Sequence, residues 1–123
     1  MAGRDGAAVV LDVNTGRILA LVHPEAALSK SFPVGSALKP LTAVAAVEQG
    51  AAAPDLAFPC PGVTALHGYE YPCWLHAGHG RLDMIEALAQ SCNIYFYTLG
   101  ARLRGSDLIQ WAEIGRASCR ERV

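Results

Sequence analysis

The sequence predicts an α+β fold in which a short β-hairpin precedes a mostly helical part. Two apolar runs, residues 7–13 and 17–23, are separated by the glycine-containing connection of residues 14–16. This pattern is typical of a β-hairpin. From residue 36 onward, apolar residues recur at spacings typical of helices.

The first half of the chain divides at its prolines and glycines. Both hairpin runs are apolar at most positions, so we expect the hairpin to be covered on both faces. Residues 24–35 begin and end with turn-forming residues and are expected to form a loop. A broadly buried helix is predicted over residues 36–49, because Pro40 fits only a first turn and Gly50 provides a C-terminal stop.

The second half is predicted to be a loop followed by helices. Residues 51–80 contain prolines, glycines and short aromatic pieces, which predict a loop with one irregular hairpin. Asp83 and Glu86 form a capping-box pattern. The tripeptide at residues 91–93 interrupts the helical pattern. Further helices are predicted over residues 83–90, 94–104 and 105–112.

The composition indicates a folded, globular chain of one small domain or part of a larger one. Its 123 residues carry a net charge of -1, with 52% hydrophobic and 17% charged residues, which is too apolar for a disordered chain. Without a basic excess, binding to nucleic acid is not expected. No run approaches the roughly 18 apolar residues of a membrane span. Residues 1–20 have no signal-peptide pattern, so we expect no signal or anchor in this chain.

The last eleven residues, 113–123, read E-I-G-R-A-S-C-R-E-R-V and do not continue the helical pattern. They resemble the translation of a common short-read sequencing adapter. We therefore expect a non-native read-through tail, although a native basic tail is the alternative. Its cysteine and arginines are excluded from the functional argument.

Ser36 and Lys39 form the strongest chemical pattern, S-A-L-K. On a helix these positions are neighbours, so the amine lies within reach of the hydroxyl. A serine becomes a nucleophile when a base removes its proton, and a lysine whose pKa is lowered by burial can be that base. The plain alternative is that Ser36 caps a helix and Lys39 is solvated.

Ser91 and Asn93 form a second pattern, S-C-N. Residues two apart share a face only in extended chain, so we expect the pair on a junction between two helices, with Cys92 pointing into the body. Ser91 could relay a proton near Lys39, and Asn93 could bind a substrate amide. The alternative is a turn followed by an N-cap.

Cysteines and histidines gather in the predicted loop. Cys60 and Cys73 flank its aromatic hairpin, and His67, His76 and His79 lie nearby in the sequence. A zinc site is conceivable, but no C-x-x-C pairing or established ligand spacing is present. We therefore expect no metal and no cofactor. Cys92 is interpreted as a small buried apolar residue.

The chain resembles the front part of the penicillin-binding transpeptidase domain. The resemblance covers residues 6–112 and is carried by three stretches: A-A-V-V-L-D-V-N-T-G-R-I-L-A-L-V, F-P-V-G-S-A-L-K-P-L-T-A-V-A-A-V-E-Q-G and G-H-G-R-L-D-M-I-E-A-L-A-Q-S-C-N-I-Y-F-Y. It implies an incomplete transpeptidase-like α+β fold, with the hairpin and the helical part present and the remaining strands missing. The family combines S-x-x-K, Ser-x-Asn and K-T-G.

The resemblance implies a role for each residue of the two patterns. Ser36 is the nucleophile that becomes acylated, Lys39 its base and Ser91 the proton shuttle to the leaving group, while Asn93 orients the substrate. The implied reaction cleaves D-Ala-D-Ala of a peptidoglycan stem peptide and passes the acyl group to an amine of a neighbouring peptide. β-Lactams would inhibit by trapping the same serine.

One part of the family pattern is missing, because neither Lys30 nor Lys39 is followed by Thr-Gly. That strand binds the substrate carboxylate and supplies half of the oxyanion hole in the family. Loss of one such donor costs on the order of 10² to 10³ in rate. We therefore expect this piece to be inactive while its parent is an enzyme.

The resemblance also places the parent on the periplasmic or extracytoplasmic face of the bacterial membrane. It implies a membrane anchor in the parent and partners that are cell-wall synthesis proteins. In such an oxidising compartment a disulfide between Cys60 and Cys73 is expected.

Two alternative functions remain open. Class D β-lactamases and penicillin-sensor domains also carry S-x-x-K, but they usually have an aliphatic residue where this chain has Asn93. A non-catalytic module could instead bind zinc through the cysteines and histidines of the loop.

Overall fold

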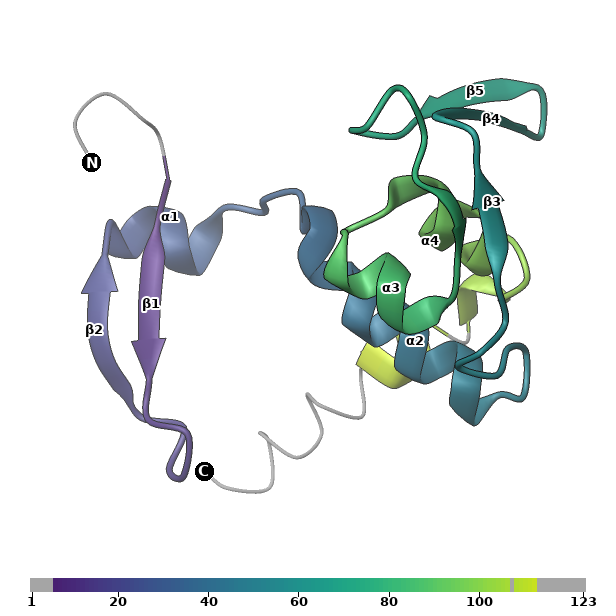
Figure 1. Ribbon diagram of the computed structural model, residues 1–123. Helices are drawn as coiled ribbons and strands as arrows, with labels where there is room; N and C mark the ends of the chain where they lie inside the picture. The colour runs from purple at the N-terminus through teal and green to yellow at the C-terminus, as the bar shows by residue number, and fades with distance from the viewer. Residues whose placement is uncertain (1–5, 107, 113–123) are drawn as a thin grey trace. The chain divides into compact units, whose positions relative to one another are not determined.

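The computed structural model describes residues 6–106 and 108–112, in two compact units divided between Pro33 and Val34. The expected tail at residues 113–123 lies outside the described residues. The elements, which Figure 1 labels, are β1 (Ala8–Leu11), β2 (Ile18–Val22), α1 (Pro24–Ser29), a 3-10 turn (Gly35–Leu38), α2 (Lys39–Glu48), β3 (Phe58–Cys60), β4 (Val63–Leu66), β5 (Tyr69–Pro72), β6 (Gly80–Leu82), α3 (Met84–Ala89) and α4 (Asn93–Gly100). Residues 105–106 and 108–112 are also helical.

The first unit is a hairpin of β1 and β2 with helix α1 against β2. The strands are antiparallel, and Asp12 closes the connection by accepting hydrogen bonds from the backbone N–H groups of Asn14 and Thr15. The hairpin confirms the prediction. Its expected coverage on both faces is not found, because Val10 and Leu19 are 52% and 64% exposed.

Helix α1 was not predicted, since residues 24–35 were expected to form a loop. The sequence carried two signals for this helix. Pro24 stands in the first turn, where its missing N–H costs nothing, and Glu25 follows it at the positive end of the helix. The loop is therefore confined to the residues after Ser29.

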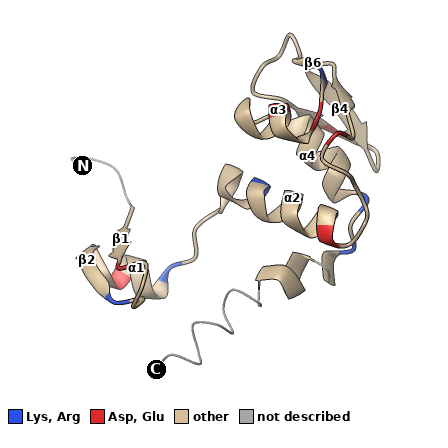
Figure 2. Ribbon diagram, turned by 60° about the horizontal axis from the view of Figure 1, so that its bottom comes forward, with Lys and Arg blue, Asp and Glu red and all other residues tan. Residues whose placement is uncertain are grey.

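Helix α2 packs on α4 through small side chains. Its buried residues are Thr42, Ala43, Ala45 and Ala46. Val44 and Val47 are exposed, so the expectation of a broadly buried helix holds for one side only. The charged residues of α2 stand at its two ends, Lys39 first and Glu48 last (Figure 2).

Residues 51–80 contain more regular structure than predicted. Strand β4 pairs with β5 in a local hairpin, and β3 pairs with β6 from Phe58–Leu82 to Cys60–Gly80. Both pairs are antiparallel. The β3–β6 pair was missed because its short strands are far apart in the sequence, so no local turn signal joins them.

Helix α4 supplies the centre of the core in the second unit. Ile94, Tyr95 and Leu99 are almost completely buried, and the Tyr95 hydroxyl donates to the Leu56 carbonyl at 2.8 Å. The core fixes α4 between α2, α3 and β3. Within the described part of the chain, no helix has the length and apolarity needed to cross a bilayer.

The capping box predicted at α3 is present in full. The Asp83 carboxylate accepts from the Glu86 N–H at 2.8 Å, and the Glu86 carboxylate accepts from the Asp83 N–H at 3.0 Å. This box fixes where α3 begins, so it also fixes where the helix ends and the 91–93 tripeptide follows.

Replacement of Asp83 by alanine should lower the free energy of unfolding by about 1 kcal/mol, because a backbone N–H loses its acceptor. Chemical denaturation of the purified chain measures this. Asp55→Ala is the control, since Asp55 is exposed in a turn and its replacement should change stability much less. Equal losses in the two variants would contradict the role of the box.

Candidate functional site

The 91–93 tripeptide forms a sharp junction between α3 and α4, as predicted. The Ser91 N–H donates to the Leu88 carbonyl and the Cys92 N–H to the Ala87 carbonyl, at 3.1 and 2.9 Å. These two bonds make a Schellman motif, in which the residue after the C-cap is left-handed and usually glycine. Here it is Ser91, with φ of 50°. The junction turns Cys92 into the core, where it is fully buried.

Lys39 joins this junction to the start of α2. Its Nζ donates to the Ser91 carbonyl at 2.7 Å, to Ser91 Oγ at 2.9 Å and to Asn93 Oδ1 at 2.8 Å. An ammonium has three protons to donate, so the acceptors match the charged form. Its Nζ also lies 5.8 Å from the centre of the Phe96 ring.

Ser36 reaches Lys39 through Ser91. Ser91 Oγ donates to Ser36 Oγ at 3.2 Å, while it accepts from Lys39. The sequence analysis expected a direct contact one helical turn apart. The structure instead places Ser36 in a 3-10 turn before α2, with Lys39 as the first residue of the helix. The four residues that the sequence singled out therefore lie together in one hydrogen-bonded chain.

The environment of Lys39 favours loss of its proton. Burial lowers the pKa of Lys39 below its ordinary value, although the nearby Cys73 and Cys92 oppose the shift. The first turn of a helix is also positive, which disfavours an ammonium there. The residue is therefore bound as a cation by three acceptors but needs less free energy than an exposed lysine to become a neutral base.

A cavity of about 430 Å³ opens beside these groups. Its lining residues are Gly35, Ser36, Leu38, Lys39, Thr42, Asn93, Phe96 and Tyr97. A hollow of about 530 Å³ in the first unit is larger, but His23 to Ala26 and Lys30 line it and none of the site residues does. The smaller cavity combines an exposed hydroxyl, an amine and an amide with apolar walls, which suits a peptide-like ligand.

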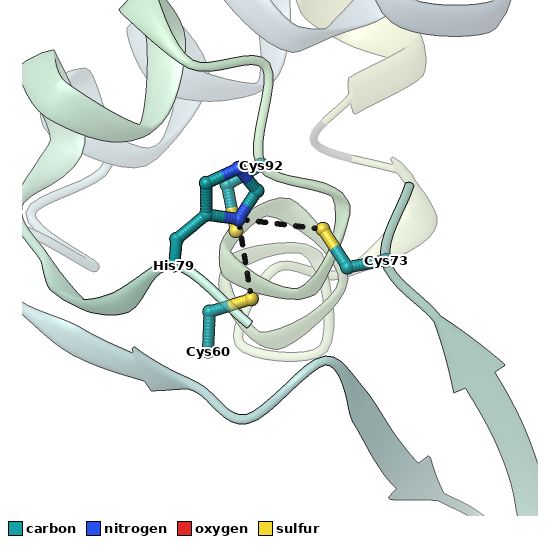
Figure 3. Close-up of side chains that lie close together, drawn as sticks. All are labelled: Cys60, Cys73, His79 and Cys92. Carbon is teal, nitrogen blue, oxygen red and sulfur yellow. Dashed lines mark hydrogen bonds between the residues drawn. The ribbon is translucent and has the colours of Figure 1, made fainter. Parts of the chain in front are cut away.

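A second cluster of side chains includes Cys92, the middle residue of the tripeptide. Figure 3 shows Cys60, Cys73, His79 and Cys92 pointing toward one another from separate segments. His79 Nδ1 is 3.4 Å from Cys60 Sγ and 3.6 Å from Cys73 Sγ, and all four donor atoms lie within 4.8 Å of one another. The three cysteines are buried, at most 2% exposed, and His79 is half-buried.

The disulfide expected between Cys60 and Cys73 is not formed in the structure, where both are free thiols. The third sulfur and the imidazole change the interpretation. Tetrahedral zinc, with bonds of about 2.3 Å to sulfur and about 2.0 Å to nitrogen, places its ligand atoms about 3.5 to 3.8 Å apart. The two His79–sulfur distances match this spacing and the other separations are at most 4.8 Å, so the four residues can hold a metal of the zinc class after a small adjustment.

Two glycines allow the chain to close around this cluster. Gly62 and Gly78 have φ of 93° and 81°, and a Cβ on either would lie 2.0 to 2.3 Å from a backbone oxygen of the opposite segment. The segments that carry Cys60 and His79 therefore touch backbone to backbone. No side chain larger than hydrogen fits at these crossings.

The pKa values of two of the cysteine thiols are shifted in opposite directions. Burial raises the pKa of Cys92 to about 12. Burial also acts to raise the pKa of Cys73, but the N–H groups of Leu75, Asn93 and Ile94 bond to its sulfur and hold the pKa below its ordinary value. A metal ion would displace the remaining thiol protons, since cysteine ligates as a thiolate.

Sequence reasoning missed Cys92 as a partner of the two loop cysteines. His79 was named beside them together with His67 and His76, and of these three histidines only His79 is in the cluster. The available signal was three cysteines and a histidine in one short stretch, but their spacing matched no established ligand pattern. The folding of two strand pairs brings them together.

Comparisons with known proteins found a matching family and similar sequences. The family described as penicillin binding protein transpeptidase domain matches residues 6–114. The chain is 29% identical to the peptidoglycan D,D-transpeptidase MrdA of Acinetobacter baumannii over 90% of this chain. It spans 21% of that protein's length.

Two solved structures have folds similar to that of this chain. Pseudomonas aeruginosa PBP2 aligns with a TM-score of 0.73 at 28% identity, over 89% of this chain and 32% of that one. A chain from a study of a peptidoglycan synthase complex aligns with a TM-score of 0.67 at 25% identity, over 89% and 24%. Both alignments cover far more of this chain than of the other, so the described elements correspond to part of a larger domain.

Proposed function

The chain belongs to the penicillin-binding protein transpeptidase domain family, and we propose that its whole protein is a peptidoglycan D,D-transpeptidase acylated at Ser36. The observation that carries this proposal is the hydrogen-bonded chain from Ser36 through Ser91 to Lys39 and Asn93. It joins a hydroxyl, a relay and an amine of lowered pKa beside one cavity. Acyl transfer needs these three groups.

The proposed reaction runs through an acyl-serine. Ser36 Oγ attacks the carbonyl of the D-Ala-D-Ala bond as its proton passes to neutral Lys39, directly or through Ser91. The C–N bond then breaks, and the departing D-Ala amine takes a proton by way of Ser91. An amine of a second stem peptide attacks the ester and restores the serine. Asn93 would orient the substrate amide in the cavity.

We assign the whole protein to the extracytoplasmic face of the cell membrane, where its substrate is assembled. Its partners would be other cell-wall synthesis proteins, as in the similar chain from a peptidoglycan synthase complex. β-Lactams would act as inhibitors because they imitate the D-Ala-D-Ala substrate and acylate Ser36. The substrate carboxylate would be bound outside this chain, since it has no K-T-G sequence.

Labelling with a fluorescent penicillin tests the proposal in the whole protein. We expect a covalent adduct that survives acid and denaturant and is lost in Ser36→Ala, because only Ser36 supplies the attacking hydroxyl. Mass spectrometry of the labelled peptide locates the ester. Ser29→Ala is the control, since Ser29 lies in the other unit. An adduct that persists in Ser36→Ala would contradict the proposal, and rapid hydrolysis of the drug would favour a β-lactamase.

Lys39 should govern the pH dependence of this labelling. Its neutral form is the base, so the acylation rate constant should rise with pH and level off below pH 10.5, the ordinary lysine pKa. Lys39→Arg should reduce acylation by about 10²- to 10⁴-fold, because a guanidinium does not release its proton. Stopped-flow fluorescence measures both. A Lys39→Arg variant with the wild-type rate and pH profile would exclude Lys39 as the base.

A second function is favoured by the separation of the four donor atoms. We propose that Cys60, Cys73, His79 and Cys92 bind one zinc-class metal ion with a structural role. The site offers four protein ligands and is buried, which is typical of structural rather than catalytic zinc. The neutral imidazole would bind through Nδ1, which faces the sulfurs.

Metal analysis of reduced protein should give one zinc per chain. Cys60→Ser should weaken binding by at least about 100-fold, because loss of a direct ligand exceeds the 10- to 100-fold cost of losing an outer partner. Competition with a chromophoric chelator measures this. His76→Ala is the control, since His76 is nearby but outside the cluster. A metal-free protein with a Cys60–Cys73 disulfide would contradict the metal site.

A further inference from the structure

The dipeptide Cys73–Trp74 contacts the 91–93 tripeptide on both of its sides. Before the tripeptide, Trp74 Nε1 donates to the Gln90 carbonyl at 3.0 Å. At its end, the backbone N–H groups of Asn93 and Ile94 lie close enough to the Cys73 thiol to lower its pKa, and Cys73 Sγ lies within 4.8 Å of Cys92 Sγ. Two adjacent residues from one loop therefore hold the polypeptide immediately before and after the catalytic hydroxyl of Ser91.

The position of Trp74 is not explained by burial, because its side chain is 59% exposed. A tryptophan normally gains most of its stabilisation from burial of its ring. Here the ring is fixed by two specific contacts. Its centre lies 5.2 Å from the His79 ring in an edge-on arrangement, and its N–H is bonded to Gln90.

The Gln90 carbonyl is a position where one bond has a large effect. It belongs to the last turn of α3, whose carbonyls have no partner within the helix. The peptide that carries this oxygen leads directly to Ser91. Ser91 is left-handed, which is unfavourable for a non-glycine residue and persists only where the surroundings hold it.

Rotation of the Gln90–Ser91 peptide would displace both oxygens that Ser91 presents to Lys39. These are its carbonyl and its Oγ, which accept from Nζ at 2.7 and 2.9 Å. The same rotation would move Ser91 Oγ relative to Ser36 Oγ, now 3.2 Å away. A bond at the Gln90 carbonyl therefore controls the geometry of the proton path.

We propose that Trp74 is a positioning residue for acylation of Ser36, and that its indole N–H holds the Gln90 carbonyl so that Ser91 stays in the path between Ser36 and Lys39. Trp74 is not among the residues that line the cavity beside Ser36, so its role would be to position Ser91. The proposal rests on the acyl-serine function proposed above, but it does not require a metal in the cysteine cluster.

Trp74→Phe in the whole protein tests this role, since phenylalanine keeps a ring against His79 and lacks the N–H donor. Rates of fluorescent-penicillin labelling over a range of drug concentrations separate the binding constant from the acylation rate constant. We expect the acylation rate constant to fall about three- to tenfold, the effect of one lost hydrogen bond. The binding constant and the midpoint of thermal unfolding should change little.

Tyr69→Phe is the matched control. Tyr69 is an exposed aromatic residue of β5, shortly before Trp74 in the sequence, and its replacement also removes one polar hydrogen. It should leave both constants unchanged. Both constants refer only to chains that become labelled, so unfolded molecules do not enter them. Trp74→Tyr, which also lacks a donor at Nε1, repeats the test if Trp74→Phe does not yield folded protein.

The outcomes separate this proposal from the proposed function. A wild-type protein that labels at Ser36, together with a Trp74→Phe variant of unchanged acylation rate constant, would overturn the positioning role alone. A change in the binding constant only would overturn it as well. A wild-type protein that is not labelled at Ser36 would overturn the acyl-serine function itself.

Discussion

The hydrogen bonds of Lys39 are the interaction on which the candidate site depends. This residue lies 52 positions before Ser91 in the sequence, yet its Nζ is satisfied by groups of the 91–93 tripeptide. A cation at the start of a helix and partly removed from water requires such acceptors. The acceptors are available at this point because the helical backbone is interrupted between α3 and α4.

The same interruption, at residues 91–93, contributes side chains to two chemically different clusters. Ser91 and Asn93 direct oxygens toward Lys39, while Cys92 between them is buried among two other cysteines and His79. Cys92 alone is extended, between the left-handed Ser91 and the helical Asn93, and this change of backbone conformation directs its side chain away from theirs. The reactive groups and the sulfur cluster are therefore linked through consecutive residues, and a displacement of one side moves the other.

Structural features that depend on residues close together in the sequence could be predicted. Asp83 with Glu86 indicated the start of α3, Pro40 and Gly50 bounded α2, and the interruption at residues 91–93 was expected. The gathering of Ser36, Lys39, Ser91 and Asn93 was expected from the family resemblance. In place of the expected direct contact between Ser36 and Lys39, the structure has a path through Ser91 Oγ.

Features that depend on distant pairing were not predictable in the same way. The β4–β5 hairpin separates strands β3 and β6 in the sequence, yet the two strands pair directly. Only this pairing brings Cys60 beside His79. Cys92 looked like an ordinary buried residue, because nothing in its local sequence distinguishes a sulfur that meets three other donors. Such clusters become visible when the tertiary structure places the segments together.

The left-handed backbone at Ser91 has opposite effects on the stability of the fold and on the proposed reaction. Glycine would relax this conformation at no steric cost, and would complete an otherwise ordinary helix ending, but it has no hydroxyl to stand between Ser36 and Lys39. In the proposed reaction such a variant would gain stability and lose its proton relay. This one backbone angle would therefore limit how far the protein can be stabilised without loss of acylation.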